Sequence, residues 1–126
     1  MKSPLKVAGY VHPPLELHLA KSVVPQQIAL VREYCRQRGF DHVLTVVETA
    51  YIGQRQYVRF AELVKASCRF ERPYDLLVTP WWSHVPLAGH AFEQMDAKLL
   101  SAGVYLIAIN DRYQPKHDLV VGGNKR

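Results

Sequence analysis

Two histidines and a serine stand directly after short apolar runs that are expected to form strands. His12 follows Leu5–Val11, and Ser83 and His84 follow Tyr74–Thr79. Histidine titrates near neutral pH, and a serine beside a histidine is the pairing of a nucleophile with its base. However, adjacent side chains usually point apart, and no Gly-x-Ser-x-Gly turn surrounds Ser83. We therefore expect Ser83 to cap the helix that follows, and we predict no catalytic residue.

Imidazole nitrogens are also common metal ligands, so the histidines raise the question of a metal site. His12, His84 and His90 have no recognised ligand spacing, and no cysteine or carboxylate pair joins them in the sequence. We expect solvated or hydrogen-bonded loop histidines and no metal. Gly53 belongs to no phosphate-cradling glycine pattern, and the chain lacks a dinucleotide fingerprint, so no cofactor is expected.

Aromatic and basic side chains near the same strand ends favour binding. Trp81 and Trp82 can stack on a base, a sugar or a partner chain, and Tyr10 lies near them. The alternative is that one tryptophan seals the base of a helix while the other covers a loop. Arg55 and Arg59 are candidates for nucleic-acid contact, although solvated surface charge is the commoner role. We name the predicted binding surface the strand-end edge, and its residues are Tyr10, His12, Trp81, Trp82, Ser83 and His84.

The composition is that of one folded domain. The 126 residues are 48% hydrophobic and 21% charged, which excludes a disordered chain. The net charge of +5 permits an acidic partner without requiring one. The two cysteines, Cys35 and Cys68, indicate reduced thiols rather than a disulfide framework. The sequence shows neither a signal peptide nor an apolar run long enough to span a membrane, so we expect a cytoplasmic protein without membrane contact.

Apolar periodicity predicts which elements position these residues. Strands are predicted at Leu5–Val11, His42–Val47, Tyr74–Thr79 and Val104–Ile109, and helices at Gln26–Arg38, Tyr57–Cys68 and Pro86–Ala102. Leu15–Val24 is interpreted as a loop or a frayed turn, and Pro25 as an early residue of the helix that follows. This alternation predicts an α/β fold in three layers, with a mostly parallel four-stranded sheet and helices on both faces. A fifth strand is possible at Leu119–Val121. Residues 1–110 are predicted to form the domain and residues 111–126 a polar basic tail.

Several segments resemble motifs of a known protein family, and they occur in the same order along the chain. Gln27 and then Val31–Phe40 are similar to a Gln followed by Leu-Arg-Glu-Tyr-Cys-x-x-Arg-Gly-Trp. Val47-Glu48 with Gly53 is similar to Val-Asp-x-Gly-x-Ser-Gly, Tyr74–Val78 to Phe-Asp-x-Val-Leu-Val, and Leu99–Val104 to Leu-x-x-x-Gly-Val. Together they resemble the N-terminal catalytic domain of the serine recombinases, the resolvase and invertase family. The resemblance covers Val7 to about Asn110.

The catalytic positions of that family are replaced in this sequence. The family begins with Tyr-x-Arg-Val-Ser, where the serine attacks a DNA phosphate, whereas this chain reads Tyr10-Val11-His12-Pro13-Pro14. Pro14 therefore occupies the position of the family's nucleophilic serine, and His12 occupies the position of its arginine. The family's Asp-Arg-Leu-x-Arg corresponds to Ser83–Leu87, so both of its arginines are absent here. Proline has no hydroxyl, and DNA cleavage through Pro14 is chemically excluded.

The resemblance and these departures lead to a functional hypothesis. We expect a catalytically inactive, resolvase-like domain that serves as a binding or regulatory module in DNA recombination or mobile elements. A protein partner or self-association is expected, with at most weak DNA binding. The alternative is a small enzyme or ligand-binding protein with His12 and His84 as acid and base in a rebuilt pocket. A third possibility is a recombinase remnant without a function.

Overall fold

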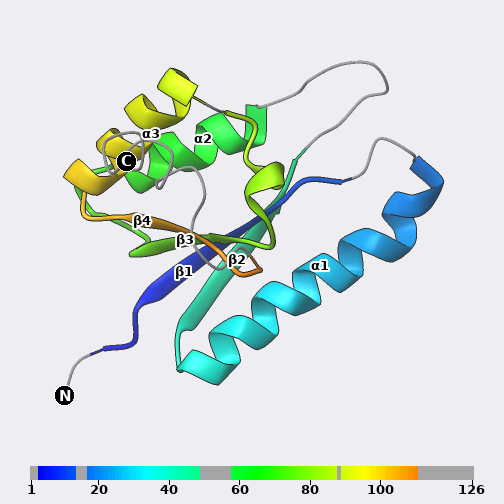
Figure 1. Cartoon of the computed structure of the whole chain (residues 1–126). Coiled ribbons are helices and arrows are strands. Elements are labelled where there is room, and N and C mark those ends of the chain that lie inside the picture. Colours follow the sequence, from blue (N-terminus) through cyan, green and yellow to red (C-terminus); the bar gives the residue numbers. More distant parts are fainter. Residues whose placement is uncertain (1–2, 14–16, 49–57, 88, 111–126) are drawn as a thin grey trace, which may run out of the picture.

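The computed structural model describes residues 3–13, 17–48, 58–87 and 89–110 of the chain (Figure 1). Strands and helices alternate along these ranges, which confirms the predicted α/β class. The strands are β1 (Lys6–Val11), β2 (Asp41–Val47), β3 (Leu76–Thr79) and β4 (Tyr105–Ala108), and the helices are α1 (Leu17–Arg38), α2 (Val58–Ser67) and α3 (Gly89–Ser101). One short 3₁₀ turn, Trp82–His84, follows β3. The predicted tail, including Leu119–Val121, lies outside the described residues.

The four described strands form a parallel sheet in the order β2-β1-β3-β4. Helix α1 covers one face, and α2 and α3 cover the other (Figure 1). The three-layer prediction is therefore confirmed. Because β1 pairs with β3, with Val7 opposite Leu76 and Gly9 opposite Val78, the loops that follow these two strands begin side by side.

Each face of the sheet has its own apolar core. Tyr10, Leu77, Phe92 and Leu99 belong to the larger cluster, under α2 and α3. On the α1 face, Val7, Val31, Cys35, Leu76 and Val78 pack together. Burial raises the pKa of the Cys35 thiol, because the low-dielectric interior disfavours the thiolate. Both cysteines are free thiols, and Cys68 is half-buried.

Gly9 sets how closely α1 approaches the sheet. A Cβ at this position would stand 2.8 Å from both Thr45 Oγ1 and Val31 Cγ1. Real Cβ atoms do not come that close to other heavy atoms. Glycine in the middle of β1 therefore allows the backbone of the strand and the side chains of α1 and β2 to meet.

The first helix is longer than its sequence pattern indicated. The prediction that Leu15–Val24 is a loop is wrong from Leu17 onward, where α1 begins. Pro25 was expected in the first turn of a helix, yet it lies well inside α1. A proline within a helix removes one backbone hydrogen bond. Pro25 is exposed, so water can satisfy the carbonyl left without an amide partner.

The third helix begins later than predicted. It starts at Gly89 rather than at Pro86. Proline biases the preceding residue toward extended backbone, and Val85 has φ −76° and ψ 121° accordingly. Ser83 lies in the 3₁₀ turn, six residues before α3, so the prediction that it caps this helix is wrong.

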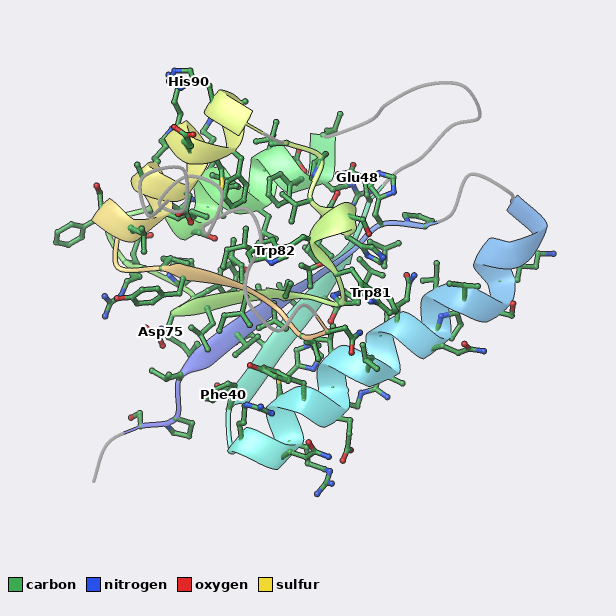
Figure 2. All side chains as sticks on the ribbon, viewed as in Figure 1. Phe40, Glu48, Asp75, Trp81, Trp82 and His90 are labelled. Atoms are coloured by element: carbon green, nitrogen blue, oxygen red, sulfur yellow. The ribbon has the colours of Figure 1, made fainter. Side chains whose placement is uncertain are left out.

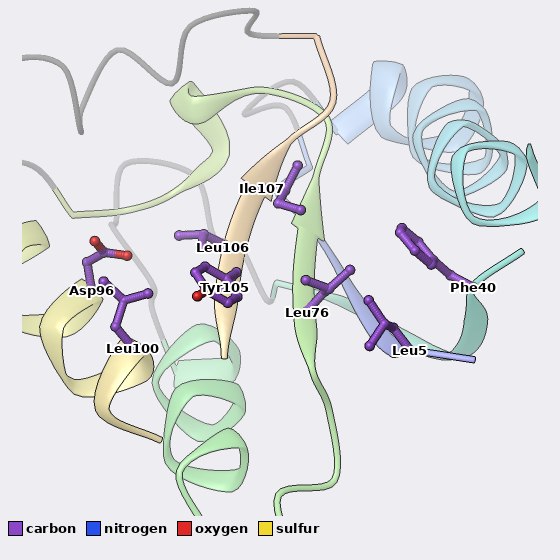
Figure 3. Close-up of a pocket in the computed structure, with 8 residues that line it drawn as sticks. All are labelled: Leu5, Phe40, Leu76, Asp96, Leu100, Tyr105, Leu106 and Ile107. Atoms are coloured by element: carbon purple, nitrogen blue, oxygen red, sulfur yellow. The ribbon is translucent and has the colours of Figure 1, made fainter. Parts of the chain in front are cut away.

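A hollow with a volume of about 460 Å³ lies at the β4 side of the sheet. Asp96 and Leu100 line it from α3 (Figure 3). Tyr105 and Leu76, the first residues of β4 and β3, line the same hollow. It therefore lies toward the amino ends of these strands, away from the strand-end edge.

None of the described helices is long and apolar enough to cross a membrane.

Candidate binding site at the strand-end edge

The pairing of β1 with β3 brings the two loop histidines into contact. The backbone N–H of His12 donates to Nδ1 of His84 at 3.3 Å. In neutral His84 the proton therefore resides on Nε2. The Nδ1 atom of His12 lies 3.0 Å from the carbonyl oxygen of Pro13 and donates to it in the matching tautomer. One imidazole thus joins the two loops, and both rings are half-buried at the rim.

Trp81 is the large aromatic group that this edge presents to solvent. Its side chain is 41% exposed, and its ring lies 5.6 Å from that of His84 at an interplanar angle of 44°. The turn beneath it is held by backbone hydrogen bonds from His84 to Trp81 and from Val85 to Trp82. Ser83 is exposed on the same turn. These side chains form the exposed part of the strand-end edge.

Tyr10 and Trp82 lie beneath the edge rather than on it. Trp82 is only 4% exposed and meets the ring of Phe92 edge-on at 5.7 Å. This is the sealing role considered for one of the two tryptophans. Tyr10 is fully buried and packs edge-on against Phe60, with 4.8 Å between ring centroids. Figure 2 labels Trp81, Trp82 and Glu48 near this end of the sheet.

Glu48 is the polar residue here that sequence reasoning did not single out. It directly follows β2, is 2% exposed, and joins three elements. Oε1 accepts hydrogen bonds from the Tyr10 hydroxyl at 2.7 Å and from the Phe60 N–H at 3.0 Å. Oε2 accepts one from the Arg59 N–H at 3.0 Å. Glu48 therefore caps the start of α2 from a distance, where the helix dipole favours an anion.

One general rule points to Glu48 as a structural residue, but not to its partners. A carboxylate placed between a buried strand and the next helix has few ways to be satisfied except by backbone N–H groups. The helix begins ten residues later, however, and capping motifs are recognised only at short spacing. The contact depends on the tertiary structure, so no local pattern contains it.

Of the remaining candidate residues, those that the structure describes do not join this site. Arg59 lies in the first turn of α2 and is exposed, and Arg55 lies outside the described residues. His90 lies on α3, away from Trp81 (Figure 2), where it contacts Gln94 at 3.2 Å and Glu93 at 3.8 Å. Within the described ranges, no three or more His, Cys, Asp or Glu side chains gather as metal ligands.

Solved structures of other proteins have a similar architecture. A resolvase family site-specific recombinase from Streptococcus pneumoniae matches with a TM-score of 0.74 and 14% identity, over 94% of this chain and 82% of that one. The C-terminal catalytic domain of ISC1926 TnpA, an IS607-like serine recombinase, matches with a TM-score of 0.64 and 15% identity, over 94% and 78%. The chain has the resolvase fold.

This agreement confirms the fold implied by the sequence resemblance. No known family profile matches the chain, and no curated protein is similar to it. At such low identity the likeness concerns the arrangement of the elements. What the resolvase fold does in this chain must therefore be argued from its own side chains at the strand-end edge.

Proposed function

We propose that this chain is a non-catalytic resolvase-fold module that binds a protein partner through the exposed part of its strand-end edge. Its biological setting is DNA recombination or a mobile element. The contact between the His12 backbone and the His84 ring carries the proposal. In this contact a ring nitrogen of His84 holds two loops together. The recombinase resemblance implies arginines, which bind phosphate, at the positions of both histidines.

The chemistry of the edge supports a non-catalytic role. Phosphoryl transfer requires several positioned cations around the phosphate and an activated hydroxyl. The edge has half-buried imidazoles and a tryptophan in their place. By sequence, Pro14 stands where the resemblance implies the nucleophile. Ser83 is the exposed hydroxyl of the edge, and it lies on a turn whose neighbouring histidine already accepts a backbone N–H.

The same features suit a protein contact. Tryptophan is enriched among the residues that dominate protein interfaces, because it buries a large area at a small entropic cost. Trp81 is exposed by 41% and is oriented by His84 and by the 3₁₀ turn. The edge therefore offers a rigid aromatic anchor surrounded by polar groups, which is the usual anatomy of a binding surface.

Site-specific photocrosslinking tests the proposal in cells. The photoreactive residue p-benzoylphenylalanine replaces Ser83 in one variant and Phe70, which is fully exposed beyond the end of α2, in a matched control. We expect a discrete protein adduct from position 83 that is absent at position 70 and lost when Trp81→Ala is added. Equal adducts at both positions, or none at position 83, would contradict the proposal.

A DNA assay separates this role from recombinase activity. The purified chain is mixed with labelled duplex DNA at about 50 mM and about 200 mM salt, a range over which phosphate contacts weaken steeply. We expect weak binding and no covalent protein–DNA adduct. An adduct that disappears in Ser83→Ala would refute the non-catalytic role, and tight, salt-sensitive binding would make the partner a nucleic acid.

A further inference from the structure

Helices α2 and α3 lie side by side on one face of the sheet (Figure 1), and a groove runs between them. Its volume is about 580 Å³. The residues that line it come from both helices and, with Leu87, from the segment before α3. This groove is separate from the strand-end edge, because no residue of that edge lines it.

The sequence explains why the groove remains open. Phe60, Val64 and Met95 are at least nine-tenths buried and form an apolar floor. Ala61 and Ala91 stand above them, one on each helix, and both are exposed. Alanine has no atoms beyond Cβ, so neither helix fills the space over the floor. An apolar groove with small residues along its walls can accept the side chains of another helix.

The charge of the groove is concentrated at one end. Lys65 lies in the last turn of α2 and Lys98 in the last turn of α3. These two helix ends are neighbours, since Cys68 Sγ lies 3.8 Å from the carbonyl oxygen of Lys98. Leu87 and Ala91 line the groove near the start of α3. Among the lining residues, two are cationic and none is acidic.

We propose that this groove binds an amphipathic helix of a partner protein that has an apolar face and acidic residues in its first turn. The carboxylates lie against Lys65 and Lys98, and the apolar face packs against the exposed Ala61 and Ala91, over the buried floor of the groove. Acidic side chains favour a helix N-terminus, so the bound helix runs antiparallel to α2 and α3. Ala91 and Lys98 are seven residues apart, or about 10 Å along a helix, so about two turns of the partner make contact.

Charge selects this occupant over a second copy of the chain. The chain has a net charge of +5, and its sequence from residue 111 onward contains four Lys and Arg residues against two aspartates, Asp111 and Asp118. Neither a second copy nor that segment brings the excess of acidic groups that two lysines at one end of the groove favour. The inference concerns a different face from the proposed function and does not depend on it.

A designed peptide provides a direct probe. A fluorescein-labelled helical peptide of about fourteen residues has leucines at helical spacing and three glutamates in its first turn. Its binding to the full chain is followed by fluorescence anisotropy. We expect saturable binding that weakens as salt is raised, because exposed charges are screened. A peptide with lysines in place of the glutamates is expected to bind at least tenfold more weakly. Equal binding of both peptides would overturn the proposal.

Substitutions locate the site. Ala91→Glu places a larger, negatively charged side chain in the groove and is expected to weaken peptide binding at least tenfold. The control, Ala97→Glu, lies on the same helix, is exposed, and does not line the groove. The double change Lys65→Glu with Lys98→Glu is expected to reverse the preference between the two peptides. Unchanged binding in Ala91→Glu would refute the site, provided that circular dichroism shows the native fold.

Two further measurements distinguish the alternatives. Trp81→Ala is expected to leave peptide binding unchanged, so failure at the strand-end edge and failure at the groove can be told apart. Sedimentation equilibrium is expected to show a monomer. A dimer that dissociates in Ala91→Glu would show that a second copy occupies the groove and would overturn the proposed partner.

Discussion

Strands β2 and β3 end at the same edge of the sheet, but the side chains that follow them differ in burial. After β2, Glu48 is almost completely buried, and its two oxygens are hydrogen-bonded to Tyr10 and to the first turn of α2. After β3, Trp81 is 41% exposed and contacts the ring of His84. The first group holds the fold together, whereas the second is available to a partner.

Burial and hydrogen bonding separate a side chain that stabilises the fold from one that can bind a partner. A buried carboxylate is costly unless its oxygens find donors, so a fully bonded one must be assigned to stability. An exposed tryptophan contributes less to folding than a buried one, and its large ring can serve as an anchor for a partner. Four substitutions test this separation, in order of decreasing loss of stability.

The substitution Glu48→Ala should have the largest effect. It removes the acceptor for the Tyr10 hydroxyl and for two backbone N–H groups at the start of α2. We expect the free energy of unfolding to fall by about 3 kcal/mol or more, since buried donors are left without partners. Urea denaturation measures the change. The matched control is Glu62→Ala, an exposed glutamate on α2, and an equal loss in both variants would refute the structural role of Glu48.

The substitution Tyr10→Phe should have a smaller effect in the same region. It keeps the edge-on ring contact with Phe60 and removes only the hydroxyl that donates to Glu48 at 2.7 Å. Hydrogen bonds to charged groups are stronger than neutral ones, so we expect a loss of about 2 kcal/mol. Thermal and urea unfolding should agree on the value. Combining Tyr10→Phe with Glu48→Ala should cost less than the sum of the two single changes, because they share one hydrogen bond.

The substitution His84→Ala probes the boundary between the two regions. It removes the acceptor for the half-buried His12 N–H and the ring against which Trp81 lies. We expect a loss of about 1 kcal/mol in unfolding free energy, since water can reach part of this site. The more informative readout is the crosslinking yield at position 83, which should fall as the tryptophan loses its orientation. A stability loss as large as that of Glu48→Ala would erase the distinction between the two strand ends.

The substitution Trp81→Ala should have the smallest effect on stability. An exposed side chain away from the core usually changes unfolding free energy by less than about 0.5 kcal/mol. We expect the unfolding midpoint in urea to stay close to that of the unchanged chain, while the photoadduct at position 83 is lost. A loss of several kcal/mol would assign Trp81 to the core and remove the aromatic anchor from the proposed function.

Much of the fold was predictable because alternation and apolar runs are local. The four strands and the order of the helices follow from segments such as His42–Val47, whose β-branched residues favour extended backbone. The burial of this segment does not follow, since β2 lies at one edge of the four described strands and Val43 is exposed. The helix boundaries were less predictable. Pro25 indicated a helix start, yet tertiary packing tolerates this proline on an exposed side of α1.

The site was predictable only in part, because it depends on contacts across the sheet. The adjacency of His12 and His84 follows from placing β1 beside β3. The burial of Tyr10 and Trp82 does not follow from the sequence, since aromatic residues occupy both cores and surfaces. Glu48 was not predicted because its donors come from Tyr10, far earlier in the chain, and from a helix that begins ten residues later.

The central position of β1 has a consequence for how the chain is made. The strand lies between β2 and β3, and the backbone N–H of Lys6 donates to Asp75, 69 residues further along. During synthesis β1, α1 and β2 emerge first, and one side of β1 then has no strand to pair with until β3 follows. An unpaired strand side is a template for pairing with other chains. Synthesis that pauses before Leu76 therefore exposes the nascent chain to misassembly, and the speed of translation through α2 becomes part of what protects the fold.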